Sequence, residues 1–469
     1  MLTVALLGCS DTAGPLTKGP FRAEVISAPS HDTVSARMSP LAVRITNAEG
    51  SPVPGVEVHI AGRRVGPVGA RAVQVSIGES IRDVGVVRTN EAGEITATLI
   101  AGETAGPATV DIQAPRLELG TTLTVTIEPG RPVIIRASEK FVALRSGATR
   151  TVQFTAFDRY LNPRTEGLAT TAVGTAFTVE PGPVLRAGAE PGTGLLIGAL
   201  GDAADTIAVS VVPPGQIAVV REPLGLIVQN LDGSNVTRVL GQFVGGLGWS
   251  PDGHELIFAK PYAIERGGLF VADLEGQIRS LSRTWPFLET AEAPQFGPGG
   301  QTVVYAYAAA IWQLRRSNDV VTQLTAGSDS HGDQFPSLAP DGTRLLFVRA
   351  GSVITNRNLT TGSETPLGVF GTMPRWSPDG QRIAYLSFAE EQLAVVAADG
   401  SGRRLLAPMP EIGSSPPAWS PDGAWLVISN PLRIVRVTDG LVVPLPDSLP
   451  GRWPVWRPTI TAWQGERLP

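Results

Sequence analysis

The sequence predicts an all-β protein in which one or two β-sandwiches precede a six-bladed β-propeller. Three observations predict this fold class. The 469 residues include 53 glycines and 40 prolines, whereas charged residues make up only 17%. A Trp-Ser-Pro-Asp-Gly phrase recurs along the second half of the chain. Short apolar runs between turn residues fill most of the remainder, and such runs are typical of strands rather than of helices.

The recurring phrase divides the second half of the chain into units of similar length. Its intact and degenerate copies place one proline at the same position of each unit: Pro251, Pro298, Pro340, Pro378, Pro421 and Pro458. Consecutive prolines lie 37 to 47 residues apart, close to the roughly 40–45 residues of a four-stranded propeller blade. Ser-Pro-Asp-Gly fits a type I turn, because proline sets φ at its second position and glycine suits its fourth. We therefore expect one strand before each turn and a buried strand after it.

The two ends of this region supply complementary parts of one blade. Before the first turn phrase, strands are expected near residues 217–220, 226–229 and 237–240, but no innermost strand precedes them. At the far end, residues 454–458 supply an innermost strand whose blade is otherwise missing. Joining the two ends closes a ring of six blades, which removes the sheet edges that an open array would expose.

These repeats resemble the propeller of the TolB family, the periplasmic component of the Tol–Pal system, with its WD40-like PD40 repeats. Residues 333–342 and 399–406 match that repeat best. The resemblance covers about residues 215–460, and we assign residues 215–469 to the propeller. Because the same repeat occurs in peptidases, in lyases and in binding proteins, the resemblance implies a fold rather than an activity.

The single cysteine, Cys9, ends an apolar N-terminal segment. One cysteine excludes an internal disulfide framework and a Cys-x-x-Cys zinc or redox site. The run Leu6-Leu7-Gly8-Cys9 resembles the lipobox of bacterial lipoproteins, which implies lipid modification of Cys9; the alternative is a chance apolar segment with a free thiol. We assign residues 1–20 to a lipoprotein signal remnant and tether. Since no run of about 18 apolar residues occurs, we expect membrane attachment through the lipid anchor only.

Residues 21–129 contain short strand patterns separated by turns. The phrase GSPVPGVEV at residues 50–58 resembles a recurrent strand–turn–strand phrase of bacterial Ig-like domains of the Big-1 (invasin/intimin) type. We therefore predict an Ig-like sandwich over residues 21–129. A hinge at residues 128–132 opens a second β unit, predicted as another Ig-like sandwich over residues 130–214, and Pro213-Pro214-Gly215 is predicted to be a stiff joint.

Few residues in the propeller suit catalysis. It contains two histidines, His254 and His331, and lacks both a Gly-x-Ser-x-Gly and a Gly-Lys sequence. The chain therefore has no α/β-hydrolase nucleophile motif and no Walker A loop. The repeated aspartates fit the turn positions better than a ring of catalytic carboxylates. We expect no enzymatic activity, no cofactor and no metal site.

The loop before residue 334 is the predicted binding site. It contains Asp329, His331 and Asp333, and loops on a rigid scaffold are where binding residues concentrate. We predict that these three side chains contact a ligand. The alternative is that His331 is an ordinary loop residue and that Asp333 belongs to the repeat and caps a blade turn.

Together these features predict a bacterial cell-envelope lipoprotein, facing the periplasm or the cell surface. Its propeller would bind an envelope protein or peptide without turnover, held off the membrane by Ig-like spacers. A net charge of −5 without a basic run argues against nucleic acid as a partner. Two alternatives stay open: an adhesin-like or glycan-binding surface protein, and a propeller enzyme such as a polysaccharide lyase or a peptidase-related protein.

Overall fold

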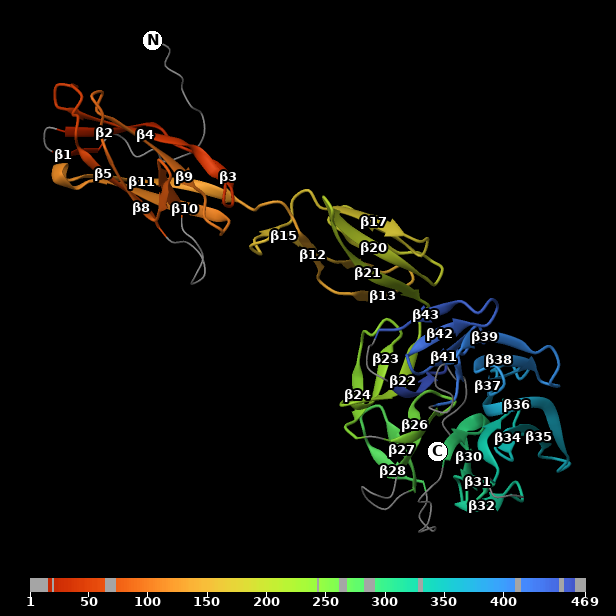
Figure 1. The fold of residues 1–469 in the computed structure, drawn as a ribbon. Coiled ribbons are helices and arrows are strands. Elements are labelled where there is room, and N and C mark those ends of the chain that lie inside the picture. Colours follow the sequence, from red (N-terminus) through yellow and green to blue (C-terminus); the bar gives the residue numbers. More distant parts are fainter. Residues whose placement is uncertain are drawn as a thin grey trace. The chain divides into compact units, whose positions relative to one another are not determined.

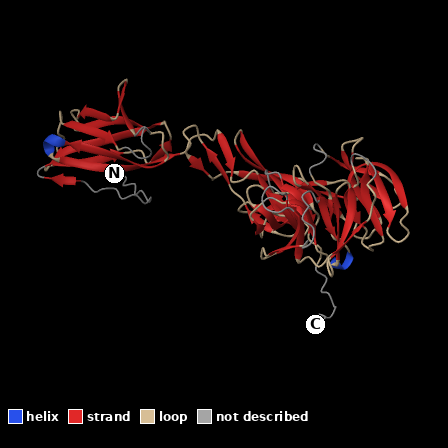
Figure 2. Ribbon diagram, turned by 90° about the horizontal axis from the view of Figure 1, so that it is seen from below, coloured by secondary structure: helices blue, strands red, loops and turns tan. Residues whose placement is uncertain are grey.

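The computed structural model describes residues 16–18, 21–63, 73–242, 244–260, 268–281, 292–327, 332–409, 415–446 and 451–459. Within these ranges strands dominate, and the helical elements are two single 3₁₀ turns, η1 (Pro115–Leu117) and η2 (Pro298–Gly300), as Figure 2 shows. The predicted all-β class is thereby confirmed. The chain divides into two compact units: Met1–Ser138 with Gln153–Thr171 and Ile197–Thr206, and Glu139–Val152 with Ala172–Leu196 and Ile207–Pro469.

In the first unit, two sheets pack face to face around one apolar core. Their strands are β1 (Leu16–Lys18), β2 (Phe21–Ser27), β3 (His31–Thr33), β4 (Arg37–Asn47), β5 (Glu57–Gly62), β6 (Gln74–Ile77), β7 (Ser80–Arg82), β8 (Val84–Arg88), β9 (Glu94–Ile100), β10 (Gly106–Ala114) and β11 (Leu119–Glu128). One sheet has the order β1-β2-β4-β9-β6-β7 and the other β3-β11-β10-β5-β8 (Figure 1). Leu41 and Leu99 of the first sheet meet Ile60 and Val110 of the second in the core. Alternating burial along β4 follows from the two-residue period of a strand.

A second β region follows the first sandwich. Its strands are β12 (Ile134–Ala137), β13 (Phe141–Arg145), β14 (Thr149–Thr151), β15 (Phe154–Phe157), β16 (Pro163–Arg164), β17 (Ala169–Val173), β18 (Phe177–Glu180), β19 (Val184–Ala187), β20 (Gly192–Leu200) and β21 (Ala203–Val212). They form sheets in the orders β12-β15-β16, β13-β21-β20-β17 and β14-β19-β18. Strands of this region belong to both compact units. The limits of 130 and 214 for this domain stay a prediction.

The second unit contains a closed six-bladed propeller. Its strands are β22 (Gln216–Arg221), β23 (Gly225–Asn230), β24 (Thr237–Leu240), β25 (Gly245–Trp249), β26 (Glu255–Lys260), β27 (Gly268–Asp273), β28 (Ile278–Ser280), β29 (Glu292–Phe296), β30 (Thr302–Tyr307), β31 (Ala310–Arg315), β32 (Val320–Gln323), β33 (Gln334–Leu338), β34 (Arg344–Arg349), β35 (Val353–Asn358), β36 (Glu364–Trp376), β37 (Arg382–Ser387), β38 (Gln392–Ala397), β39 (Arg404–Pro408), β40 (Ala418–Trp419), β41 (Trp425–Ile428), β42 (Arg433–Arg436), β43 (Val442–Pro444) and β44 (Gly451–Trp456). Each blade has four strands, and we number the blades 1 to 6 in chain order (Figure 1). The strand β36 serves blade 4 as its outermost strand and blade 5 as its innermost strand, so these two blades form one seven-stranded sheet.

Strands from both ends of the propeller complete blade 1. Its order is β24-β23-β22-β44, and the antiparallel register pairs Ile217 with Trp456 and Ala218 with Val455. The innermost strand β44 lies next to the innermost strands of blade 2, β25, and of blade 6, β40. The predicted closure of the ring by the two chain ends is therefore confirmed.

The recurring phrase forms a turn with a fixed set of side-chain bonds. In blade 2 the Ser250 hydroxyl donates to the Asp252 carboxylate (2.6 Å) and accepts the Glu255 amide (2.8 Å), while the carboxylate accepts the His254 amide (3.1 Å). The copies at 377–382 and 420–425 make the same three bonds. Burial acts to raise the pKa of Asp252, but the donors outweigh it and the pKa is lowered. These aspartates are thus occupied by the turns that they form.

Arginine side chains connect neighbouring blades at these turns. The Arg382 guanidinium of blade 5 lies 5.1 Å from the ring centre of Trp419 in blade 6 and donates to the Gly423 carbonyl (3.1 Å). In the same way, Arg457 lies over Trp249 and donates to the turn carbonyl of blade 2, across the ring closure. Each such contact combines a cation–π interaction with a charge-assisted hydrogen bond. The tryptophan of the phrase therefore packs between blades.

A β-bulge shapes the innermost strand of five blades. The residue three positions before the aromatic or leucine of the phrase has a positive φ of 47° to 57°: Gly246, Ala293, Phe335, Met373 and Trp453. A register shift accompanies each of these residues. Bulges increase twist and redirect side chains. The bulges occur near the axis of the ring, where the innermost strands converge.

Candidate binding cleft

A cleft with a volume of about 740 Å³ lies between blades 3 and 4 of the propeller. Gln323, Leu324, Thr325 and Ala326, at and after the end of β32, form the blade 3 side. Arg349, Arg357, Gly362 and Glu364 form the blade 4 side. We call this space the 3/4 cleft. Most of its side chains are polar, so it suits a polar ligand better than an apolar one.

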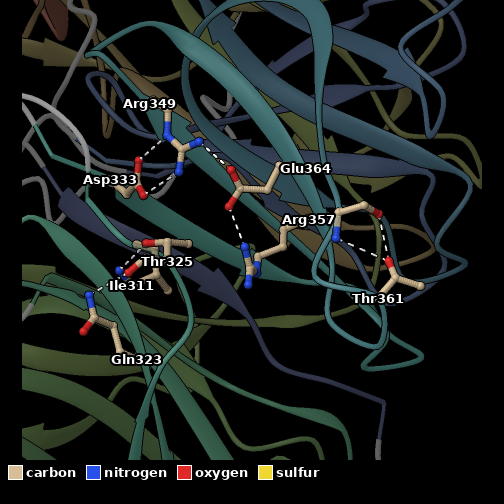
Figure 3. A network of polar contacts seen from close by, with 9 residues as sticks. Ile311, Gln323, Thr325, Asp333, Arg349, Arg357, Thr361 and Glu364 are labelled. Atoms are coloured by element: carbon tan, nitrogen blue, oxygen red, sulfur yellow. Dashed lines mark hydrogen bonds and ion pairs between the residues drawn. The ribbon is translucent and has the colours of Figure 1, made fainter.

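Four charged side chains form a chain of ion pairs along the blade 4 side (Figure 3). Asp333 accepts two bonds from Arg349, one from Nε and one from Nη2, each 2.9 Å long. The Nη1 atom of Arg349 donates to Glu364 (2.5 Å), and Arg357 Nη1 donates to the other oxygen of Glu364 (2.7 Å). Two positive and two negative groups therefore alternate, and their formal charges cancel.

The protonation of this network follows from its contacts. The hydrogen bonds that Arg349 donates to Asp333 raise the pKa of Arg349, against the opposing effect of its own burial. Burial acts to raise the pKa of Glu364, but the bonds from Arg349 and Arg357 outweigh it and the pKa is lowered. Both ions are thus kept charged at neutral pH. The Glu364 carboxylate therefore stays ionised to a lower pH than an ordinary glutamate does.

Neighbouring groups hold the walls of the 3/4 cleft in place. The buried Thr325 accepts the Ile311 amide at its hydroxyl (2.9 Å), and its carbonyl accepts a bond from the Gln323 amide group (2.8 Å), as Figure 3 shows. On the opposite side, the Arg349 guanidinium lies 4.8 Å from the ring centre of Phe347. Both walls are therefore ordered without a ligand, which reduces the entropy lost on binding.

The arrangement can donate hydrogen bonds to a neutral polar ligand. Arg349 uses three of its five N–H groups for carboxylates, and Arg357 uses one. The side chains of Arg349, Arg357 and Glu364 are 25–27% exposed. Because the network carries no net charge, it favours carbonyl, amide or hydroxyl groups over a bare anion. Such groups occur on a peptide backbone and on a glycan.

The structure places one of the three predicted binding residues. The Asp333 side chain has 0% exposure, and both of its carboxylate oxygens accept hydrogen bonds from Arg349. Asp333 therefore influences the cleft by positioning Arg349. Asp329 and His331 lie outside the described residues, as does the predicted lipidation site Cys9. Ligand contact by Asp329 and His331 stays a prediction, and so does lipid modification of Cys9.

Sequence reasoning missed the residues that line the 3/4 cleft. Arg349 ends β34, Arg357 lies in β35 and Glu364 begins β36, so no short motif contains all three. Their shared orientation depends on strand register, which pairs Arg357 with Glu364. The one signal in the sequence was Asp333, an acidic residue next to the repeat that needed a partner once buried.

No family model matches the chain. It is 35% identical over 126 residues to the "Uncharacterized peptidase YuxL" of Bacillus subtilis, a match that covers 24% of this chain and 18% of that protein. It is 24% identical over 162 residues to the "Uncharacterized protein Atu1656" of Agrobacterium fabrum, a match that covers 30% of this chain and 54% of that protein. The chain thus spans under a fifth of the first relative's length and about half of the second's.

Among solved structures, TolB from Acinetobacter baumannii is similar to this chain with a TM-score of 0.47 and 19% identity. The match covers 63% of this chain and 84% of that one. Within the described ranges, no three His, Cys, Asp or Glu residues are grouped so that they could hold a metal ion. Nor does any helix there have the length and apolar character needed to cross a membrane.

Proposed function

We propose that the propeller binds a protein or peptide of the bacterial cell envelope without chemical turnover, and that the 3/4 cleft contacts this partner. The observation that carries this proposal is the Asp333–Arg349–Glu364–Arg357 network, whose guanidinium groups are held in place and keep donors free at the cleft surface. An extended polypeptide presents backbone carbonyls that such donors recognise. Fixed donors on a rigid scaffold favour recognition of a defined shape.

We further propose that Cys9 is lipid-modified and that Ig-like sandwiches separate the propeller from the membrane. The support is the lipobox-like run ending at Cys9 and the β-sandwich that precedes the propeller. With a complete signal sequence upstream, wild type should fractionate with membranes, and Cys9→Ala should be released. Equal release of both proteins would contradict lipid attachment.

Capture from envelope extract tests the binding proposal. The bait is the chain lacking residues 1–9, which keeps all described residues. We expect Arg357→Ala to lower capture of a specific protein at least tenfold, because it removes donors from the 3/4 cleft. The matched control is Arg436→Ala, which removes an arginine that is paired with Asp439 in blade 6. Equal capture by both variants would exclude the 3/4 cleft as the contact site.

The two alternatives give different results with the same bait. A glycan-binding protein would be retained on envelope polysaccharide, and retention would fall with Arg357→Ala and not with Arg436→Ala. A propeller enzyme would release fragments from polysaccharide or peptide, detectable by mass spectrometry. Either outcome, without capture of a protein, would replace the proposed function.

A further inference from the structure

A second cleft lies between blades 5 and 6 and has a volume of about 380 Å³. We call it the 5/6 cleft. Blade 5 contributes the hairpin loop between β37 and β38 and the end of β39, and blade 6 contributes β42 and β43. Its lining residues are Glu390, Glu391, Gln392, Ala407, Pro408, Met409, Arg433 and Val442.

Among the described residues, the positive charge of the 5/6 cleft has no carboxylate partner. The Nη2 atom of Arg433 donates to the Pro408 carbonyl (2.6 Å) and contacts the Met409 sulfur (3.8 Å). Its Nε atom is buried without an acceptor, and no acidic group of the described chain forms an ion pair with it. Burial lowers the pKa of Arg433, as expected for a cation that has lost water and gained no anion. A partly buried cation of this kind favours an anionic ligand.

The walls around Arg433 combine apolar surface with acceptors. Met409 and Ala407 are 2% and 1% exposed, and Val442 is half-buried. Met409 and Ala407 therefore form the buried floor of the cleft, and its accessible apolar surface comes from Val442 and the exposed Pro408. The Glu391 side chain is exposed at the rim and forms no hydrogen bond or ion pair with the described residues, so it can accept an N–H group from a ligand.

The other acidic residue of the 5/6 cleft is already occupied. Glu390 forms an ion pair with Arg403 and accepts the Ser387 hydroxyl (2.5 Å). It therefore does not compete for Arg433. The exposed Glu391 carboxylate is screened by water and salt far more than the partly buried guanidinium is, so its repulsion of an incoming anion is weak.

We propose that the 5/6 cleft binds the C-terminal end of an extended peptide whose last side chain is apolar. The terminal carboxylate would pair with Arg433, the last side chain would lie against Val442 and Pro408, and a backbone N–H would donate to Glu391. An inorganic anion would leave the apolar wall uncovered. A fatty acid would leave the rim acceptor unused. The inference rests on the proposed function in that it takes the partner to be a polypeptide.

Paired peptides that differ only in the terminal group test this inference. The probes are fluorescein-labelled hexapeptides ending in leucine, one with a free carboxylate and one with a carboxamide, titrated against the chain lacking residues 1–9 and read by fluorescence anisotropy. We expect the free acid to bind at least tenfold tighter than the amide. A free acid ending in serine is expected to bind several-fold more weakly than the leucine peptide, because it covers less apolar surface.

Two substitutions separate the roles of charge and fold. Arg433→Met keeps an apolar side chain of similar length and is expected to abolish the preference for the free acid. Arg404→Met is the matched control, since the Arg404 guanidinium donates to the Thr438 carbonyl and Arg404 is not among the residues that line the cleft. Thermal unfolding checks that both variants fold. Should Arg433→Met not fold, Val442→Asp provides a second test: its added carboxylate should weaken binding of the acid more than binding of the amide.

Equal affinity of wild type for acid and amide would overturn the inference, as would a preference that survives in Arg433→Met. Competition by sodium acetate as strong as that by the leucine peptide would show a simple anion site and would also overturn it. Capture of an envelope protein is measured on the same preparations. Capture without a free-acid preference would reject the 5/6 cleft inference and leave the proposed function standing.

Discussion

The 3/4 cleft and the 5/6 cleft both contain arginine side chains, but they neutralise them differently. In the 3/4 cleft, Arg349 pairs with Asp333 and Glu364, and Arg357 shares Glu364. In the 5/6 cleft, Arg433 has a backbone carbonyl and a sulfur atom as partners. The first arrangement is complete without a ligand, whereas the second leaves a charge for a ligand to neutralise.

This difference separates two uses of a guanidinium group. A paired guanidinium contributes to stability, because removing either partner leaves a buried charge uncompensated. An unpaired one contributes little to stability and can contribute more to binding. Substitutions in the two clefts should therefore have different effects on folding, and the following experiments compare them, from the largest expected effect to the smallest.

Opening the ring should disrupt both clefts together. Deleting residues 452–469 removes most of β44, which exposes the edge of β22 in blade 1 and removes the neighbour of β25 and β40. We expect loss of cooperative unfolding and aggregation at micromolar concentration, measured by circular dichroism and light scattering. A truncated chain that unfolds at the wild-type temperature would contradict closure by β44.

Removing the buried Asp333 beside the 3/4 cleft should have the next largest effect on stability. Asp333→Ala leaves Arg349 with one carboxylate partner instead of two, and we expect a loss of about 2–4 kcal/mol in the free energy of unfolding. Urea titration measures it. The control is Asp439→Ala in the exposed pair with Arg436, expected to change stability by less than about 0.5 kcal/mol. Equal effects of the two substitutions would refute the stabilising role of the network.

The contribution of Glu364 should depend on pH. Its pKa is lowered from 4.5 in the folded chain, so the unfolded chain takes up the proton first as the pH falls. The stabilisation by Glu364 is therefore present above its unfolded pKa and lost as the pH falls through the folded value. We expect Glu364→Gln to lower stability by about 1–2 kcal/mol at pH 7, and the difference from wild type to shrink below pH 4.5. A difference independent of pH would contradict this assignment.

Removing the unpaired arginine should change stability least. Arg433→Met deletes a partly buried charge that has no carboxylate partner in the part of the chain that the structure describes, and we expect the free energy of unfolding to stay within about 1 kcal/mol of wild type. The corresponding change in the 3/4 cleft, Arg349→Met, leaves Asp333 buried and unpaired and should cost about 3 kcal/mol. Similar losses for both variants would remove the distinction between the clefts.

The sequence predicted the fold because each repeat is marked by residues whose local conformational preferences form a turn. Ser-Pro-Asp-Gly sets a turn by itself, and its three intact and three degenerate copies at blade spacing predict the ring and its closure by residues 454–458. The sequence did not predict the β-bulges of the innermost strands. Phe335, Met373 and Trp453 have a positive φ, which side chains of this kind rarely adopt, and only the packing of the innermost strands imposes it.

The candidate clefts were less predictable than the fold. Asp333 was noted from its loop, but its burial against Arg349 follows from strand register. Arg433 gave no signal at all, because whether an arginine is paired depends on neighbours that lie far away in the sequence. Which groups lie beside Arg433 depends on how two adjacent blades pack, and no local sequence pattern predicts it.

The double pairing of β22 has a mechanical consequence. This strand enters the ring directly after Gly215 and has β23 on one side and β44 on the other. A pull on the chain ahead of Gln216, as from a tethered protein whose partner is moving away, acts along the axis of β22. Ladder hydrogen bonds lie across that axis, so the bonds on both sides resist the load in shear, together rather than one after another. The strand where the ring closes is therefore also the strand best placed to withstand tension.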